Sequence, residues 1–424
     1  MKLHWQILIA MVLAAICGQI TGTEMSLFGI TSFYQIYDFF GTLFLNALRM
    51  IIVPLIMASI ITSIANIGTG GDLGRLGYKT MGYYFFTSTL AILVGLMFVN
   101  ILTPGTLDGV AVGASLNLDL DSAEVSSAIA SVEDHGGGDI VAIFLRMVPT
   151  NIVAAAAEGR MLGLIFFSLV FGFFMTQIPQ RQSEVMLSFW QGVSETMMKI
   201  TMWIMTFAPY GVFGLVAKTV ASTGFAAFEP MLWFFITVSL ALACHAFVVL
   251  PLLLKFVAKV RPQSHFQAMA PALLTAFSSA SSSATLPLTM ECVEKNAGVS
   301  ERTTSFVLPL GATINMDGTA LYECVAAIFL AQAYGLEMSF VTQFTVVIVA
   351  LLTSIGVAGI PAASLVAITV ILTAIGLPIE AIGLLLVTDR ILDMFRTAVN
   401  VFSDSCGAVI IAKSEGEEGI LAGK

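Results

Sequence analysis

The sequence predicts an all-α polytopic membrane protein. Of its 424 residues, 58% are hydrophobic and only 11% are charged, and the mean hydropathy is +0.94. Soluble domains are about 25% charged, so this composition argues against a soluble enzyme. The net charge is −9, which provides no basic surface for nucleic acid. We therefore expect the lipid bilayer as a partner, and no nucleic acid.

Six apolar runs in the first part of the chain are long enough to form membrane helices. A transmembrane helix needs about 20 mostly apolar residues. The runs lie at 5–21, 37–66, 80–103, 139–178, 186–217 and 227–259. The first run lacks a convincing signal-peptide cleavage site, so we interpret it as a retained helix.

The positions of lysine and arginine predict the orientation of the chain. The basic residues that follow the second, fourth and sixth runs are Arg75, Lys79, Arg181, Lys255, Lys259 and Arg261. By contrast, the third loop is rich in Asp and Glu and has no basic residue. We therefore expect a cell-membrane protein with cytoplasmic termini and an acidic external loop. Arg160 and Lys218 are exceptions to the pattern.

Two later apolar segments are interrupted at their middles by small residues, at 277–287 and 354–364. Serine competes for backbone hydrogen bonds, and glycine and proline break helices. Such backbone survives at membrane depth only where protein buries it or where it lines a cavity. We therefore expect two re-entrant helical hairpins, followed by long helices at 303–332 and 378–413. This repeated unit points to a transporter site; a kinked bundle helix without a ligand is the alternative.

The helix expected at 378–413 carries its polar residues on one face. The residues that fall within an arc of about 100° at 100° per residue are Asp389, Asp393, Arg396, Thr397, Asn400 and Asp404. Arg396 suits a carboxylate, Asp393 can accept an ammonium group, and a half-helix tip can bind a second carboxylate. Together these groups describe an acidic amino acid. The alternative is a buried ion-pair network, although one arginine cannot neutralise three aspartates.

The preceding helix contains an Asn-Met-Asp-Gly sequence at its middle, from Asn315 to Gly318. Asn, Asp and Gly together predict an unwound turn with free carbonyl groups. Carbonyl and carboxylate oxygens are hard ligands, suited to an alkali cation, and Asn400 and Asp404 could join them. A simple glycine kink is the alternative.

Three motifs, 281–283, 315–319 and 393–400, resemble those of the dicarboxylate/amino acid:cation symporters. This family includes the animal excitatory amino acid transporters and archaeal aspartate transporters. The resemblance runs along the whole chain and is densest over 270–413. It implies a homotrimer in which each chain has eight transmembrane helices, two re-entrant hairpins and inverted repeats, and works as an elevator-type transporter.

The resemblance also implies a scaffold domain and a transport domain. The scaffold would comprise residues 1–75 and 139–218, and an acidic extracellular loop would cover 105–138. The transport domain would comprise 76–104, 219–262, the first hairpin at 263–302, a helix at 303–335, the second hairpin at 336–376 and the last helix with its tail at 377–424. The second hairpin would be the outer gate.

The same resemblance assigns roles to individual residues. Arg396 would contact the side-chain carboxylate of the substrate, and Asp393 its amino group. The other implied substrate-binding residues are Ser282, Thr319, Ile360, Ser364, Thr397 and Asn400. The implied sodium ligands are Tyr84, Thr87, Ser88, Gly311, Thr313, Asn315, Asp317, Ser354, Ile355, Val357, Asn400 and Asp404. Glu323 matches a glutamate thought to carry a proton; a permanently protonated or ion-paired structural glutamate is the alternative.

These observations predict a secondary active symporter of L-aspartate and/or L-glutamate, driven by Na⁺ and by co-transported H⁺. Potassium counter-transport is left open, because Met394 stands where animal members have an arginine. A C4-dicarboxylate:cation symporter is the alternative, although carriers of that kind tend to lack an acid at Asp393. An ion channel is the alternative from another class. No enzyme is expected, because the chain has neither a zinc-protease motif nor a complete Walker loop.

Overall fold

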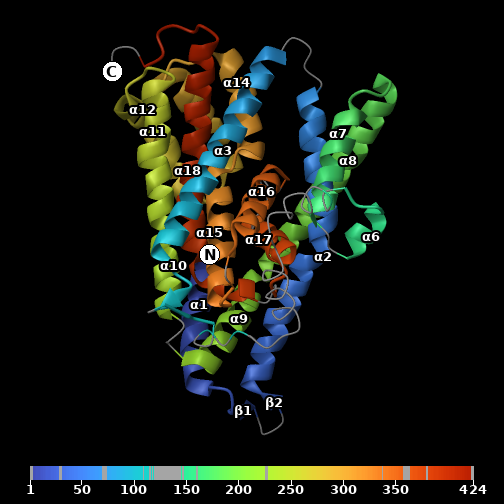
Figure 1. The fold of residues 1–424 in the computed structure, drawn as a ribbon, viewed down its shortest axis with the longest axis vertical. Coiled ribbons are helices and arrows are strands. Elements are labelled where there is room, and N and C mark those ends of the chain that lie inside the picture. The colour runs from blue at the N-terminus through green and yellow to red at the C-terminus, as the bar shows by residue number, and fades with distance from the viewer. Residues whose placement is uncertain are drawn as a thin grey trace.

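The computed structural model shows a bundle of helices (Figure 1). It describes residues 3–421 except 28–30, 69–73, 108, 114–115, 117, 119–144, 146–147, 159–160, 225–227, 337, 357–362 and 379–380. Most of the acidic loop, and the tip of the second hairpin, therefore lie outside the described residues. The short strands β1 (Ser26–Leu27) and β2 (Thr31–Ser32) pair antiparallel, with Ser26 opposite Ser32. The strands β3 (Thr106–Leu107) and β4 (Val110–Ala111) also pair antiparallel.

One group of helices packs around the long helix α2. Its members are α1 (Leu3–Thr21), α2 (Phe33–Gly68), α6 (Ile152–Ala157), α7 (Met161–Met175), α8 (Gln180–Thr206) and α9 (Ala208–Thr223). Helix α9 lies against α1 and α2, and α2 also contacts α7 and α8. Lys218 on α9 forms an ion pair of 2.6 Å with Asp38 on α2. This pairing neutralises one of the two basic residues that depart from the charge pattern.

A second group of helices surrounds α15 and α18 (Figure 1). Its members are α3 (Gly74–Leu102), α10 (Phe228–Cys244), the π-helical turn η3 (His245–Val249), α11 (Leu250–Phe256), α14 (Glu301–Ile314), α15 (Asp317–Ala333) and α18 (Ile382–Ser414). Helix α15 is buried along nearly its whole length. It packs against α3, α10 and α18, which explains why most of its residues are apolar.

Both predicted interruptions are bounded by a pair of helices that pack against each other. In the first hairpin, α12 (Pro262–Ser279) ends at Ala280, which adopts the left-handed conformation with φ 49°. Ser281 then caps α13 (Ser282–Glu291), because its side chain accepts a hydrogen bond from the Ala284 amide. A second π-helical turn, η4 (Cys292–Asn296), follows α13. In the second hairpin, α16 (Phe340–Gly356) contacts α17 (Ala363–Ile375).

The helix expected at 303–332 is interrupted at the predicted position. Helix α14 ends at Ile314, and Asn315 is extended, with φ −97° and ψ 92°. Met316 is also non-helical, and α15 begins at Asp317. The prediction of an unwound turn at the Asn-Met-Asp-Gly sequence is therefore confirmed.

Several helices have the length and apolar character of membrane spans. Within the described part of the chain, four helical segments pass this test, namely Phe33–Thr62, Arg75–Leu102, Glu229–Phe256 and Glu301–Ala333. Helices α8 and α9 would form a fifth, with a bend of 55°. Pro209 near the start of α9 accounts for the bend. This supports a multi-pass membrane protein, whereas the predicted count of eight helices stays a prediction.

Candidate functional site

The polar face of α18 is turned into the protein. The relative exposure is 1% for Arg396, 5% for Thr397, 3% for Asn400 and 3% for Asp404. The residues between them on the helix are mostly apolar, so the predicted periodicity places the polar groups on the buried side. Helix α18 contacts α15, the first hairpin and α17. Its charged residues therefore lie where both hairpins can reach them.

Arg396 is the centre of the charged part of this face. Its Nη2 atom lies 3.0 Å from Oδ1 of Asp389 and 3.0 Å from Oδ1 of Asp393. Its Cζ atom lies 4.0 Å from the ring centroid of Tyr322, a cation–π arrangement. The buried Nε and Nη1 atoms have no hydrogen-bond partner among the described residues. Because unpaired buried donors are unfavourable, the guanidinium is suited to a further acceptor.

A second arginine takes part in this cluster. Arg390 Nη1 donates to Asp393 Oδ2 over 3.1 Å, so Asp393 lies between two guanidinium groups. The expectation that a single arginine faces the aspartates of α18 is therefore wrong. Ser364 of α17 points its hydroxyl toward Asp389 at 3.5 Å. The Asp393 side chain is 29% exposed, which leaves it accessible to a ligand.

The start of α15 is fastened to α18 by Asn400. Its Oδ1 atom accepts a hydrogen bond of 2.7 Å from the Gly318 amide, and its Nδ2 atom lies 3.2 Å from Thr319 Oγ1. A Cβ atom on Gly318 would lie 2.7 Å from the carbonyl oxygen of Arg396. Glycine at this position thus permits the close approach of the two helices. Thr397 donates to the carbonyl oxygen of Asp393 over 2.8 Å.

A second cluster, the oxygen cluster, is formed where α3, the break between α14 and α15, and α18 meet. It contains Thr87 and Ser88 of α3, Asn315 and Asp317 at the break between α14 and α15, and Ser403 and Asp404 of α18. Ser88 Oγ and Ser403 Oγ donate to the two oxygens of Asp317 over 2.7 and 2.6 Å. Asn315 Nδ2 donates to Asp404 Oδ1 over 2.9 Å. The Asn315 Oδ1 atom lies 3.4 Å from the hydroxyls of Thr87 and Ser88.

Two further predicted sodium ligands border the oxygen cluster. A Cβ atom on Gly311 would lie 2.5 Å from Asp404 Oδ1 and 2.7 Å from Tyr84 Oη. The Tyr84 hydroxyl donates to the carbonyl oxygen of Val307 over 2.6 Å. Gly311 therefore leaves space beside two oxygen atoms that a larger side chain would occupy.

Other predicted residues are not brought to these clusters by the described part of the chain. Thr313 is exposed, and its hydroxyl bonds to the carbonyl oxygen of Leu310 over 2.9 Å. Ser354 and Ile355 lie in the last turn of α16, but the positions of their side chains are not described. Val357 and Ile360 lie outside the described residues. Ser282 is buried at the first position of α13.

Sequence reasoning missed several contributors to the site. His245 places Nε2 3.1 Å from Asp317 Oδ2. Tyr322 and Ser403 also contact charged groups of the two clusters. A signal for His245 was its position inside an apolar span, in what proves to be a π-helical turn, a feature that often marks functional sites.

Glu323 lies on α15 and is fully buried, with a relative exposure of 0%. Its Oε2 atom accepts a hydrogen bond of 3.0 Å from Thr353 Oγ1, and its Oε1 atom has no partner among the described residues. In the part of the chain that the structure describes, it forms no ion pair. This geometry gives no support to the alternative of an ion-paired structural glutamate.

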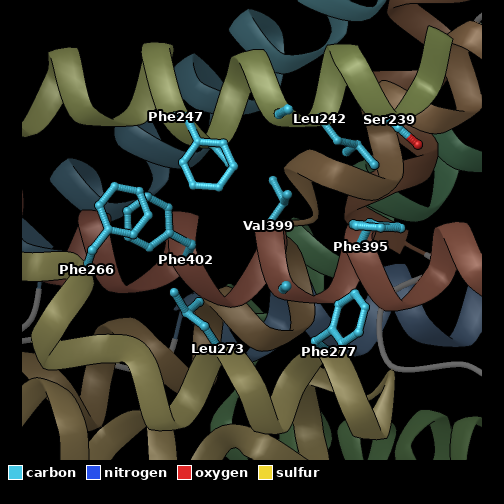
Figure 2. Close-up of a pocket in the computed structure, with 12 residues that line it drawn as sticks. Ser239, Leu242, Phe247, Phe266, Leu273, Phe277, Phe395, Val399 and Phe402 are labelled. Atoms are coloured by element: carbon cyan, nitrogen blue, oxygen red, sulfur yellow. The ribbon is translucent and has the colours of Figure 1, made fainter. Parts of the chain in front are cut away.

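An apolar cavity of about 310 Å³ adjoins the first hairpin. Figure 2 shows that Phe247, Phe266, Phe277, Phe395 and Phe402 line it. Ser239 is the one polar residue of the lining. Because none of the charged residues of α18 lines this cavity, it does not provide the chemistry to bind a charged substrate.

A further polar cluster lies beyond the last turn of α18. Lys79 and Arg75 of α3 both pair with Glu415. The hydrogen bond from Lys79 lowers the pKa of Glu415, despite partial burial. Burial raises the pKa of Glu417, but hydrogen bonds from Thr303 and Ser300 at the start of α14 outweigh it and lower the pKa overall. These ionised carboxylates fasten the end of the chain to α3 and α14.

The helical membrane-type fold, the buried charged face of α18 and the oxygen cluster define a polytopic membrane transporter. The chain belongs to the sodium:dicarboxylate symporter family, whose model matches residues 3–414. This confirms the resemblance noted in the motifs. Because the family consists of symporters, it also confirms the expectation of a transporter rather than an enzyme.

Several relatives are similar to this chain over nearly its whole length. The proton/glutamate-aspartate symporter of Escherichia coli (strain K12) is 35% identical over 98% of this chain and 93% of the relative. The proton/sodium-glutamate symport protein of Geobacillus stearothermophilus is 36% identical over 100% of this chain and 96% of the relative. Excitatory amino acid transporter 3 of Mus musculus is 35% identical over 98% of this chain and 86% of the relative.

Proposed function

We propose that this chain is a symporter of acidic amino acids, L-aspartate and/or L-glutamate, driven by sodium and proton gradients. The observation that carries the proposal is the buried guanidinium of Arg396, which has two donors without partners and lies beside the accessible carboxylate of Asp393. The names of the relatives, which include glutamate, aspartate, sodium and proton, support this choice of substrate and ions.

Arg396 and Asp393 would bind the two oppositely charged ends of the substrate. Arg396 would bind the side-chain carboxylate, because a guanidinium offers planar, charge-assisted donors. Asp393 would accept the ammonium group, because its carboxylate is negatively charged and its side chain is 29% exposed. The remaining contacts would come from Thr319, Thr397 and Asn400, with Ser282, Ile360 and Ser364 of the hairpins closing the site.

Sodium ions would bind among the oxygen atoms near Asp317 and Asp404. Asp317 and Asp404 are both buried in the oxygen cluster, and burying two carboxylates is energetically unfavourable unless cations or hydrogen-bond donors compensate their charge. All the predicted groups present hard oxygen ligands, which suit sodium better than a transition metal. The sodium ligands proposed here are Tyr84, Thr87, Ser88, Gly311, Asn315, Asp317, Asn400 and Asp404, with Thr313, Ser354, Ile355 and Val357 forming a further site at the second hairpin. Glu323 would carry the proton.

The transport cycle would follow an elevator mechanism in a homotrimer. The separation of the helices into a group around α2 and a group around α15 and α18 supports the division into scaffold and transport domains with the boundaries predicted above. The second hairpin touches α2 and α7 as well as α15, as a gate between the two domains would. Each chain would have eight transmembrane helices and cytoplasmic termini. No observation favours potassium counter-transport, which is not part of the proposal.

Uptake of labelled L-aspartate into proteoliposomes tests this function. Sodium and pH gradients are imposed separately, and unlabelled succinate is added as a competitor. We expect uptake that requires sodium, depends on pH and is not displaced by succinate. Uptake of succinate in place of aspartate would instead identify a C4-dicarboxylate carrier. Ion movement that continues without a substrate gradient, and that is not coupled to substrate transport, would identify a channel.

A further inference from the structure

The side chain that hydrogen-bonds to Glu323 among the described residues belongs to the second hairpin. Thr353 lies in the last turns of α16, and both side chains have a relative exposure of 0%. The distance from Thr353 Oγ1 to Glu323 Oε2 is 3.0 Å. Thr353 lies on α16 of this hairpin, three residues before the helix ends at Gly356. A hydrogen bond thus joins the proposed proton carrier to the proposed gate.

The charged surroundings of Glu323 are otherwise sparse. Helices α16 and α17, which both pack against α15, carry no ionisable residue. From α18, the guanidinium of Arg396 attracts the ionised form of Glu323 without a direct contact, and Cys324 is its neighbour on α15. The tyrosines of α3, Tyr83 and Tyr84, face Asp317 and Asp404 instead. On α10, the acidic Glu229 is exposed in the first turn.

The Thr353 hydroxyl can serve both protonation states of Glu323. A threonine hydroxyl has one proton to donate and two lone pairs that accept. Its Oγ1 atom lies 3.0 Å from Glu323 Oε2 and also 2.8 Å from the carbonyl oxygen of Val349. When Glu323 is ionised, the hydroxyl can donate to the carboxylate. When Glu323 is protonated, the hydroxyl can accept from it and donate to the Val349 carbonyl.

We propose that Thr353 is a positioning residue that links the protonation of Glu323 to the placement of the second hairpin. The inference rests on the proposed proton-carrying role of Glu323. With the hairpin in place, Glu323 Oε2 keeps Thr353 as a hydrogen-bond partner whether the proton is bound or released. When α16 moves away, the ionised carboxylate loses the one donor it has among the described residues, and protonation relieves that loss. Gate movement and proton uptake are coupled in this way.

Four variants test this proposal, and two of them separate the effect of the Thr353 hydroxyl from that of the side-chain shape. Thr353→Val keeps the shape and removes the hydroxyl, whereas Thr353→Ser keeps the hydroxyl and removes a methyl group. Thr345→Val is the matched control, because the Thr345 hydroxyl on the same helix bonds to the carbonyl of Val341 over 2.9 Å and not to a carboxylate. Glu323→Gln tests the proton carrier itself. The measurement is sodium-driven uptake of labelled L-aspartate as a function of pH, with KM and maximal rate determined at each pH.

We expect Thr353→Val to move the midpoint of the pH profile upward by about one pH unit, because a hydrogen bond to an ionised group is stronger than one to a neutral group. Its maximal rate should change more than its KM. Thr353→Ser and Thr345→Val should keep the wild-type profile, and Glu323→Gln should lose the pH dependence. A wild-type profile for Thr353→Val, beside a flat profile for Glu323→Gln, would overturn the role of Thr353 alone.

Other outcomes separate this inference from the proposed function. If Glu323→Gln kept the wild-type pH dependence, both the proton-carrying role and the role of Thr353 would be withdrawn, while aspartate uptake would still establish the symporter. Should Thr353→Val not transport, proton uptake on aspartate binding is measured on the purified protein by calorimetry in buffers of different ionisation enthalpy. If Thr353→Val took up the same number of protons as the wild type at every pH in that assay, the coupling would also be refuted.

Discussion

Replacing Arg396 by glutamine tests the recognition of an acidic side chain most directly. Glutamine is shorter and carries no charge, although its amide keeps two hydrogen-bond donors. In the structure it would leave Asp389 and Asp393 without the cation that lies 3.0 Å from each of them. It would also remove the charged donor that we propose for the substrate carboxylate.

The size of the effect follows from the burial of the guanidinium. Arg396 is 1% exposed, so solvent does not screen its interactions strongly. Truncation of one partner in a buried, hydrogen-bonded charge pair costs about 2–5 kcal/mol. If this loss falls on the complex with L-aspartate, the Kd should rise about 30- to 5,000-fold.

Arg390 provides a matched control on the same helix. Its side chain is 25% exposed and pairs with Asp393 over 3.1 Å. Partly exposed ion pairs contribute about 0.2–1 kcal/mol, so Arg390→Gln should change the Kd less than about sixfold. A binding titration of purified protein and uptake into proteoliposomes are measured for both variants, together with the elution profile as a check of folding. Aspartate affinity within threefold of wild type in a folded Arg396→Gln protein would refute the proposed role.

The remaining predictions concern the ions and the end of the chain. Asp404→Asn removes a formal charge from the oxygen cluster, so the sodium concentration for half-maximal uptake should rise about tenfold; an unchanged sodium titration would contradict the proposed ligand. His245→Leu removes the contact with Asp317 and should alter sodium dependence more than aspartate KM, whereas equal changes in both would argue for a purely structural role. Glu417→Gln should destabilise the protein by about 1 kcal/mol, because hydrogen bonds to a partly exposed carboxylate are weakened by solvent. Since the pKa of Glu417 is lowered on folding, this contribution is present above its usual value of 4.5 and is lost as the pH falls through the lowered pKa. Thermal unfolding of both proteins at neutral and acidic pH measures this, and a difference that persists in acid would contradict the ionic explanation.

Local sequence patterns predicted a large part of the fold and the site. The helical period placed Arg396, Asn400 and Asp404 on one face of α18, and this face is buried. Serine and left-handed backbone mark the tip of the first hairpin at Ala280. The Asn-Met-Asp-Gly sequence marks the break after Ile314. These features depend on backbone preferences within a few residues, which the sequence carries directly.

Contacts between distant helices could not be predicted in this way. A helical period determines which residues share a face, but not which helix packs against that face. His245 meets Asp317 across 72 positions in the chain, and Arg390 adds a second cation that the period alone did not bring into the cluster. The sodium ligands therefore stay a prediction, although the structure brings several of them together from α3, α14, α15 and α18.

The amino-acid sequence alone is enough to identify a helical membrane protein, to locate breaks in its helices and to show which residues on α18 share a polar face. Composition, helical period and backbone-breaking residues suffice for this, because each acts locally. The three-dimensional structure was needed to show that Thr353 of the second hairpin hydrogen-bonds to Glu323, and that groups from α3, η3 and α18 surround Asp317 at hydrogen-bond distance. The physical reason is that these hydrogen bonds form between helices whose mutual packing depends on the whole bundle, and no short segment encodes that packing.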